Sequence, residues 1–128
     1  MTLFWQNYGI TKKIDTMTNY NKGDVVLVNF IYSEEGGTKY RPAVIINSDS
    51  YHCSRGEVIV AAITSKVGSL FVGDYLIRDW KETGLLHPSV VTGILRTIKK
   101  SMIHRKLGSM PEKDIKSIEI ALREILGL

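Results

Sequence analysis

The sequence predicts a mainly β fold with some α: a small, strongly bent antiparallel β-barrel followed by a C-terminal amphipathic helix. Several short runs rich in β-branched and aromatic residues lie close together, separated by glycine and polar turns, which is typical of a barrel or a sandwich. The end of the chain instead repeats its apolar residues at helical spacing. Helical patterns do not alternate with the strands, as they would in βα units.

Five segments are predicted as strands. The first follows Asp24 and reads Val-Val-Leu-Val-Asn-Phe-Ile, a composition that suits a mostly buried strand. The second begins at Pro42, a tolerated place because proline cannot donate to a central ladder. A polar connection is expected over residues 48–56. The strands are expected at residues 25–31, 42–47, 57–64, 75–77 and 89–97.

One helix is predicted after Pro111, which marks its start. Its apolar residues form a single stripe, and charged residues occupy the other faces. We expect this stripe to close one side of the barrel rather than to bind a ligand. The stripe consists of Ile115, Ile118, Leu122, Ile125 and Leu126.

Length and composition indicate one domain in a reducing compartment. The 128 residues suffice for one hydrophobic core, expected over residues 22–128 behind a flexible N-terminal arm over residues 1–21. Cys53 is the only cysteine, which excludes an internal disulfide. No apolar run approaches the roughly 20 residues of a membrane span, and the N-terminal segment does not resemble a secretory signal. We therefore expect a cytoplasmic protein without a membrane partner.

The charge balance favours an anionic partner. Seventeen basic and 13 acidic side chains give a formal net charge of +4 and a pI near 9.2. The same excess of basic residues can also serve solubility alone, so both interpretations stay open.

Three short segments place a cation or a hydroxyl at a predicted strand end, where functional loops often begin. They are residues 39–42, 64–66 and 95–97. Arg41 offers a planar fork of protonated donors that matches a phosphodiester oxygen or the charge on a pentacoordinate phosphorus. Taken alone, Arg41 could equally be an exposed arginine or part of an ion pair, and Thr64 and Ser65 could simply satisfy a strand end.

The order of these segments resembles the MazF/PemK family of toxin endoribonucleases over residues 22–128. The family's opening is matched by Lys-Gly-Asp-Val-Val-Leu-Val-Asn-Phe at residues 22–30, and its arginine-proline strand by Tyr-Arg-Pro-Ala-Val-Ile-Ile-Asn at residues 40–47. Its threonine-serine strand end is matched by Val-Ala-Ala-Ile-Thr-Ser at residues 60–65. Further matching segments lie at residues 84–91, 96–98, 106–109 and 120–128.

The resemblance implies a homodimer of SH3-like, MazF/CcdB-like barrels with a basic groove for single-stranded RNA. Attack by the 2′-hydroxyl would leave a 2′,3′-cyclic phosphate and a 5′-hydroxyl end, so neither a cofactor nor a metal is expected. His52, His87 and His104 are indeed far apart in the sequence, without the close spacing of metal ligands. A toxin also implies an antitoxin with an acidic, partly disordered segment that fills the groove, and DNA binding together with that antitoxin.

The resemblance assigns catalysis to Arg41 and Thr64. Because arginine almost never gives up its proton, Arg41 is expected to stabilise the phosphorane electrostatically, although a proton-transfer role has also been suggested for the family's arginine. Thr64 would hydrogen-bond a phosphate oxygen or orient the 2′-hydroxyl. The expected RNA-binding residues are Asn29, Phe30, Lys39, Ser65, Lys66 and Arg96.

Several side chains keep an alternative interpretation. Phe30 and Tyr32 could stack on splayed bases or pack in the barrel. His52 and His104 are expected first as surface or capping histidines, with general acid catalysis as the alternative.

Two departures from the family leave base recognition open: Gly93 and Ile94 stand where many relatives carry an aspartate-glutamine pair, and Asn29 replaces a common aspartate.

Two other functions share the expected fold. CcdB-like gyrase poisons act through a tryptophan-containing C-terminal tip, whereas Trp5 and Trp80 of this chain lie elsewhere. A non-catalytic nucleic-acid-binding barrel would use the same basic residues, because these supply affinity without chemistry. Only an activity measurement separates that barrel from a ribonuclease.

Overall fold

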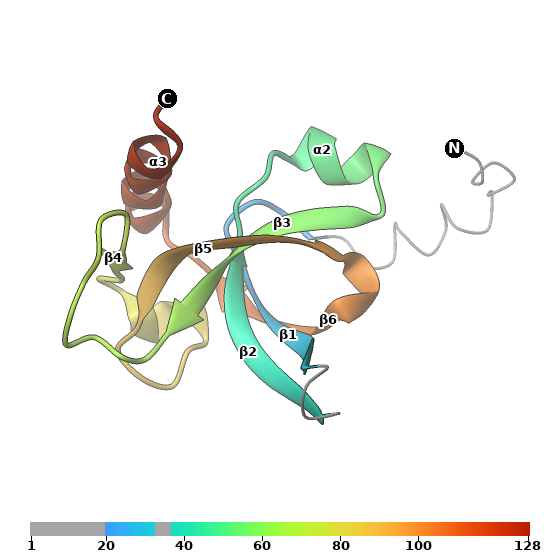
Figure 1. Ribbon diagram of the computed structural model, residues 1–128, viewed down its shortest axis with the longest axis horizontal. Coiled ribbons are helices and arrows are strands. Elements are labelled where there is room, and N and C mark those ends of the chain that lie inside the picture. Colours follow the sequence, from blue (N-terminus) through green and yellow to red (C-terminus); the bar gives the residue numbers. More distant parts are fainter. Residues whose placement is uncertain (1–19, 33–36) are drawn as a thin grey trace, which may run out of the picture.

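The computed structural model describes residues 20–32 and 37–128, in which six strands form one antiparallel sheet and a long helix follows them (Figure 1). The predicted arm, residues 1–21, lies almost entirely outside these residues. The strands are β1 (Asp24–Tyr32), β2 (Gly37–Ile45), β3 (Glu57–Thr64), β4 (Tyr75–Leu76), β5 (Val90–Lys99) and β6 (Ile103–Ser109). The helices are α2 (Asp49–Ser54), α3 (Glu112–Leu126) and the 3₁₀ helices η1 (Trp80–Thr83) and η2 (Lys100–Met102).

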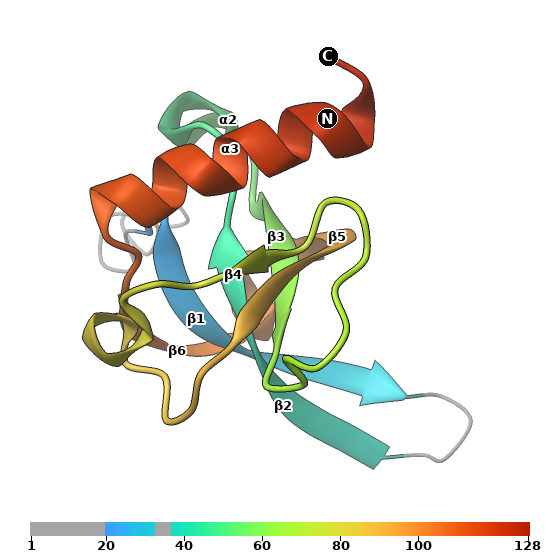
Figure 2. The ribbon, with the colours of Figure 1, turned by 90° about the vertical axis from the view of Figure 1, so that its left-hand side faces the viewer.

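The sheet is strongly bent but not closed. Its strand order is β4-β5-β3-β2-β1-β6, and within the described residues no pairing joins β4 to β6 (Figures 1 and 2). The mainly β antiparallel class with a C-terminal helix is confirmed, whereas the expectation of a closed barrel is wrong. The reason lies at the two edges: β4 has only two residues, and η1 packs against β6 instead. A Cβ on Gly108 of β6 would lie 2.5 Å from the carbonyl oxygen of Thr83, so the backbones of β6 and η1 pack directly against each other.

The structure differs from the prediction at four places along the chain. β2 begins at Gly37, ahead of Pro42, and β5 continues to Lys99. The polar connection after β2 contains the six-residue helix α2. The strand β6 was not predicted at all. These segments are short or highly charged, so their residues show little of the alternation that marks a half-buried strand.

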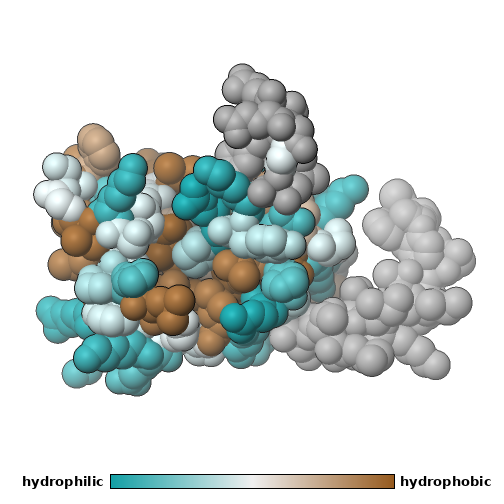
Figure 3. All heavy atoms as spheres, turned by 90° about the horizontal axis from the view of Figure 1, so that it is seen from below, coloured by the Kyte–Doolittle hydropathy of each residue, from teal (hydrophilic) through white to brown (hydrophobic). Residues whose placement is uncertain are grey.

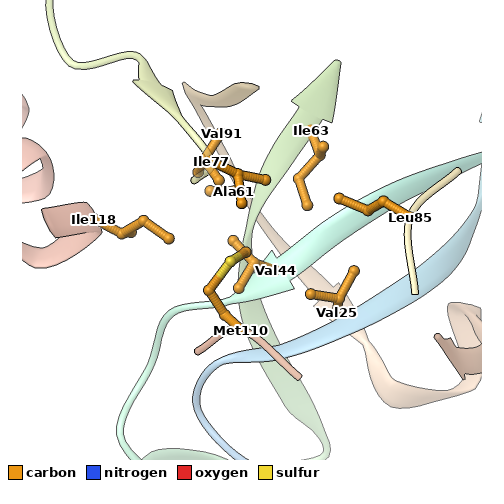
Figure 4. Packing of buried hydrophobic residues seen from close by; sticks show 9 residues of the cluster. All are labelled: Val25, Val44, Ala61, Ile63, Ile77, Leu85, Val91, Met110 and Ile118. Atoms are coloured by element: carbon orange, nitrogen blue, oxygen red, sulfur yellow. The ribbon is translucent and has the colours of Figure 1, made fainter. Parts of the chain in front are cut away.

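Alternation along the strands divides the interior into two cores on opposite faces of the sheet. In β1, Val25 points to one face, and Val26 and Val28 point to the other. The first face, which we call the helix-side core, also contains Ile118 of α3 and Met110 (Figure 4). The second, which we call the strand core, consists of buried residues from the strands alone: Val26, Val28, Phe30, Ala43, Ile45, Val58, Val60, Ile98 and Ile103.

The helix α3 begins directly after Pro111, as predicted, and lies along one side of the sheet (Figure 2). Of the predicted stripe, Ile118 is buried, and Leu126 is 54% exposed. The fully buried carboxylate of Asp114 fixes the first turn, because it accepts hydrogen bonds from the Tyr75 hydroxyl and from the backbone N–H of Arg78 at 3.0 Å. Partial burial raises the pKa of Tyr75, and the hydrogen bond to Asp114 raises it further. Within the described residues, no helix is long and apolar enough to cross a membrane.

Candidate active site

Pro42 stands where the ladder between β2 and β3 stops. The two strands pair only over Ala43–Ile45, with Ala43 opposite Ala62. Proline has no N–H, so it cannot donate to a ladder. Continuing the same register by two residues sets Arg41 level with Thr64 and on the same face, because side chains two residues apart share a face. The two predicted catalytic residues therefore meet where the strands separate.

A pocket of about 410 Å³ opens at this separation. Its apolar lining includes Ile63, Leu85 and Leu107, which also belong to or pack against the helix-side core. Four residues predicted as catalytic or RNA-binding line the pocket together with three polar residues that had no assigned role in the site. The polar lining residues are Arg41, Thr64, Ser65, Lys66, His87, Ser89 and Arg105.

One wall of the pocket is the segment of residues 84–89, which is held at both ends. Leu85 is buried in the helix-side core, and Ser89 is 4% exposed. The Ser89 hydroxyl donates to the His87 carbonyl at 2.8 Å, while the Ile77 N–H donates to the Ser89 carbonyl at 3.0 Å. His87 is thus exposed on a segment with fixed neighbours. Gly84 has a φ of +84°, and a Cβ there would lie 2.1 Å from the Leu107 carbonyl oxygen, so only glycine fits.

The pocket is positively charged. It brings Arg41, Lys66 and Arg105 together, and among the described residues no acidic side chain lines it. The Thr64 hydroxyl oxygen accepts the backbone N–H of Lys66 at 3.2 Å, which leaves the hydroxyl proton available for an acceptor in the pocket. An anion such as a phosphodiester is the ligand that this combination of cations and a hydroxyl donor fits.

The remaining predicted RNA-binding residues lie outside the pocket. Phe30 is 6% exposed in the strand core, and the Arg96 guanidinium lies 5.0 Å from its ring centroid, so Phe30 takes the packing alternative. Lys39 pairs with Phe30 across the β1–β2 ladder, and Asn29 pairs with Tyr40. The side chain of Tyr32 lies outside the described residues.

The three histidines occupy different environments. His52 is 3% exposed and is therefore neither a surface nor a capping histidine. Asn47 Oδ1 accepts the Ile59 N–H at 2.7 Å and Asn47 Nδ2 donates to the Ser48 carbonyl, which fixes the orientation of the amide. His52 Nδ1, 2.9 Å from Asn47 Nδ2, must then be an acceptor, so this histidine has a packing role.

His104 is exposed, and its ring lies against Tyr40. His87 and Arg105 are the pocket residues that the sequence reasoning gave no specific role. A histidine just before a strand was a weak signal for His87, and Arg105 lies on the strand that was not predicted. Within the part of the chain that the structure describes, no three His, Cys, Asp or Glu side chains gather to hold a metal ion.

Comparisons with known proteins agree with this fold. The model of the PemK-like, MazF-like toxins of type II toxin-antitoxin systems matches residues 21–126. The chain therefore belongs to this family.

Among curated relatives, the endoribonuclease MazF of Staphylococcus saprophyticus is 32% identical over 111 residues, covering 84% of this chain and 91% of that protein.

Solved structures share the fold. A mycobacterial endoribonuclease in complex with its cognate antitoxin aligns with a TM-score of 0.71 and 17% identity, covering 86% of this chain and 97% of that chain. A MazE–MazF complex from Deinococcus radiodurans aligns with a TM-score of 0.70 and 18% identity, covering 85% and 97%. The sequence-based recognition of the family is confirmed.

Proposed function

We propose that this protein is the toxin of a type II toxin-antitoxin pair and a metal-independent endoribonuclease that cleaves single-stranded RNA at a short sequence, thereby inhibiting translation and growth. The observation that carries the proposal is the pocket that brings Arg41 of β2 and Thr64 of β3 together with Lys66 and Arg105. The naming of the staphylococcal relative as an endoribonuclease supports it.

The residues of the pocket suit transesterification within the RNA. The 2′-oxygen attacks the adjacent phosphorus, the bond to the 5′-oxygen breaks, and the products are a 2′,3′-cyclic phosphate and a 5′-hydroxyl end. Arg41 stabilises the extra negative charge on the pentacoordinate phosphorus through its guanidinium. Thr64 donates its hydroxyl proton to a phosphate oxygen, and Ser65 and Lys66 hold the neighbouring phosphates.

The same proposal includes two protein partners and a cytoplasmic location. An exposed apolar surface borders the pocket, where Phe71 and Val72 are 79% and 77% exposed and Ile94 is 62% exposed. Apolar residues also lie exposed beside hydrophilic ones on the face seen in Figure 3. Exposed surfaces of this kind mark sites of protein association. We assign this surface to a homodimer, and the basic pocket to the acidic segment of an antitoxin. A complex of the mycobacterial endoribonuclease with its cognate antitoxin and the MazE–MazF complex support an antitoxin partner.

The test is cleavage of a long single-stranded RNA in EDTA, with mapping of the new 5′ ends. Discrete cuts with 5′-hydroxyl ends are expected from the wild type. Arg41→Ala and Thr64→Ala are each expected to lose about 10²- to 10³-fold in kcat, the cost of removing one preorganised transition-state donor. Arg55→Ala is the matched control, because exposed Arg55 pairs with Glu57 on the surface, outside the pocket.

Intact RNA with folded, antitoxin-free wild-type protein would contradict the proposal and favour gyrase inhibition or plain nucleic-acid binding. Undiminished cleavage by Arg41→Ala would contradict the assignment of the site. Loss of cleavage in EDTA would contradict the metal-independent mechanism.

A further inference from the structure

Tyr40 and His104 form a pair of rings at the surface, outside both hydrophobic cores. Their centroids are 5.0 Å apart, and their planes are tilted by 59°. Tyr40 is 51% exposed, and His104 is also exposed. Exposed aromatic faces of this kind are the surfaces on which unpaired bases stack.

The rings lie on the face of the sheet that carries Leu27 and Pro42, which form part of the pocket lining. In the β1–β2 ladder, Leu27 pairs with Pro42 and Asn29 pairs with Tyr40, so all four side chains share one face. Leu27 and Pro42 line the pocket. Asn29 and Tyr40 follow two residues further along their strands, about 7 Å away.

A β-bulge in β6 brings His104 to the same place. Leu27 pairs with Arg105, but Val28 pairs with Ile103, so His104 is an extra residue between the two pairs. Bulges re-aim side chains and are common beside active sites. Here the bulge sets His104 against Tyr40 across β1, while its neighbour Arg105 lines the pocket.

The Asn29 amide carries an unused acceptor between these groups. Its Oδ1 is buried and has no hydrogen-bond partner among the described residues. Buried side-chain oxygens are usually partnered, and leaving one unpartnered costs stability. Each RNA base presents an N–H donor on its Watson–Crick edge, which proteins read on unpaired bases.

We infer that Tyr40, His104 and Asn29 form a subsite for one unpaired RNA base, next to the nucleotide whose phosphate occupies the pocket. This inference rests on the proposed ribonuclease function. The base stacks on Tyr40 beside His104, and its edge donates to Asn29. Arg41 stays at the reacting phosphate, and Arg105, which shares a face with Leu27, holds the phosphate on the side of the subsite. Phosphate contacts position the strand and base contacts specify it, so this subsite makes cleavage depend on the base at one position.

The test is a double-mutant cycle between the protein and the RNA. An oligoribonucleotide spanning a cut mapped with the wild type carries a single abasic residue at each position in turn. At one position beside the cut, we expect the abasic residue to lower the wild-type kcat/KM about 5- to 150-fold, the range of one base–aromatic stack. In Tyr40→Ala the same abasic residue should cause little further loss.

Three further variants sharpen the cycle. Tyr40→Phe keeps the ring and should keep the wild-type sensitivity to the abasic residue. Tyr51→Ala, in α2 outside the pocket, is the matched control and should also behave as the wild type. Asn29→Ala should lower kcat/KM for the intact oligoribonucleotide, and the abasic residue at the same position should then cause a smaller loss than in the wild type.

The outcomes separate this subsite from the function on which it rests. If the losses from Tyr40→Ala and from the abasic residue multiply at every position, the subsite is overturned and the ribonuclease stands. If Asn29→Ala lowers kcat/KM by the same factor with and without the abasic residue, Asn29 does not belong to the subsite. If the wild type cuts no RNA, the proposed function and the subsite fall together.

Discussion

The strand core and the helix-side core lie on opposite faces of one sheet, and only the helix-side core reaches the pocket. Ile63 and Leu85 are buried in the helix-side core and also line the pocket, whereas no described residue of the strand core does. The helix-side core also depends on α3, β4 and the segment of residues 84–89. The hydrogen bond from Tyr75 to Asp114 joins β4 to α3, and the one from the Ile77 N–H to the Ser89 carbonyl joins the chain after β4 to the segment. The shape of the pocket is therefore coupled to the packing of these elements, while the strand core supports the sheet alone.

The largest expected effect comes from truncating one residue in each core. Ile45→Ala in the strand core and Leu85→Ala in the helix-side core should each destabilise the protein by about 2–5 kcal/mol. Only Leu85→Ala should also lower kcat/KM for RNA cleavage, because only Leu85 lines the pocket. Urea denaturation and cleavage assays under conditions where both variants are folded measure the two effects. If both substitutions lowered kcat/KM equally, the pocket would depend as much on the strand core as on the helix-side core.

A smaller effect is expected where η1 meets β6. Gly108→Ala places a methyl group against the Thr83 carbonyl and should cost about 1–3 kcal/mol, the range for overpacking. Gly56→Ala is the matched control, because a Cβ there meets nothing within 4 Å. The free energies of unfolding of the two variants decide this prediction. A neutral Gly108→Ala would mean that η1 moves freely, and that the wall of the pocket is adjustable.

The smallest effect concerns the pH dependence of α3 docking. The pKa of Tyr75 is raised, because burial and the Asp114 carboxylate disfavour a phenolate, so the neutral form is the one favoured by folding. Its contribution to stability is present below the ordinary tyrosine pKa of about 10, and is lost as the pH rises through the raised value. Tyr75→Phe should therefore show a shallower loss of stability in alkali than the wild type, in thermal unfolding followed across this range.

The sequence predicted the segments whose pattern reflects packing. The apolar run of β1, the strand β3 and the helical stripe of α3 each bury a regular set of residues, and each was found close to its expected place. β6 was missed because Ile103 is followed by His104, Arg105 and Lys106, and because a strand with charged residues at a sheet edge shows no alternation.

The residues of the candidate site also fall into two groups, those that the sequence predicted and those that it did not. Arg41, Thr64, Ser65 and Lys66 lie at the ends of two predicted strands, and the pocket brings them together. His87 and Arg105 come from a connecting segment and from the unpredicted strand, so only the tertiary contacts of η1 and β6 place them. The sequence also could not show that β4 would stop after two residues and leave the sheet open.

The bulge at His104 is a place where related chains can differ in length within β6 without a change of fold. Because His104 is the extra residue of the bulge, its loss would leave Arg105 opposite Leu27 and Ile103 opposite Val28, so the residues on both sides of it keep their faces. β6 is an edge strand, and only Ile103 of it is buried, so such a change leaves the interior of the sheet almost untouched. Loss of one codon at His104 would thus remove one ring of the inferred base subsite while Ile103 stays buried and Arg105 stays at the pocket.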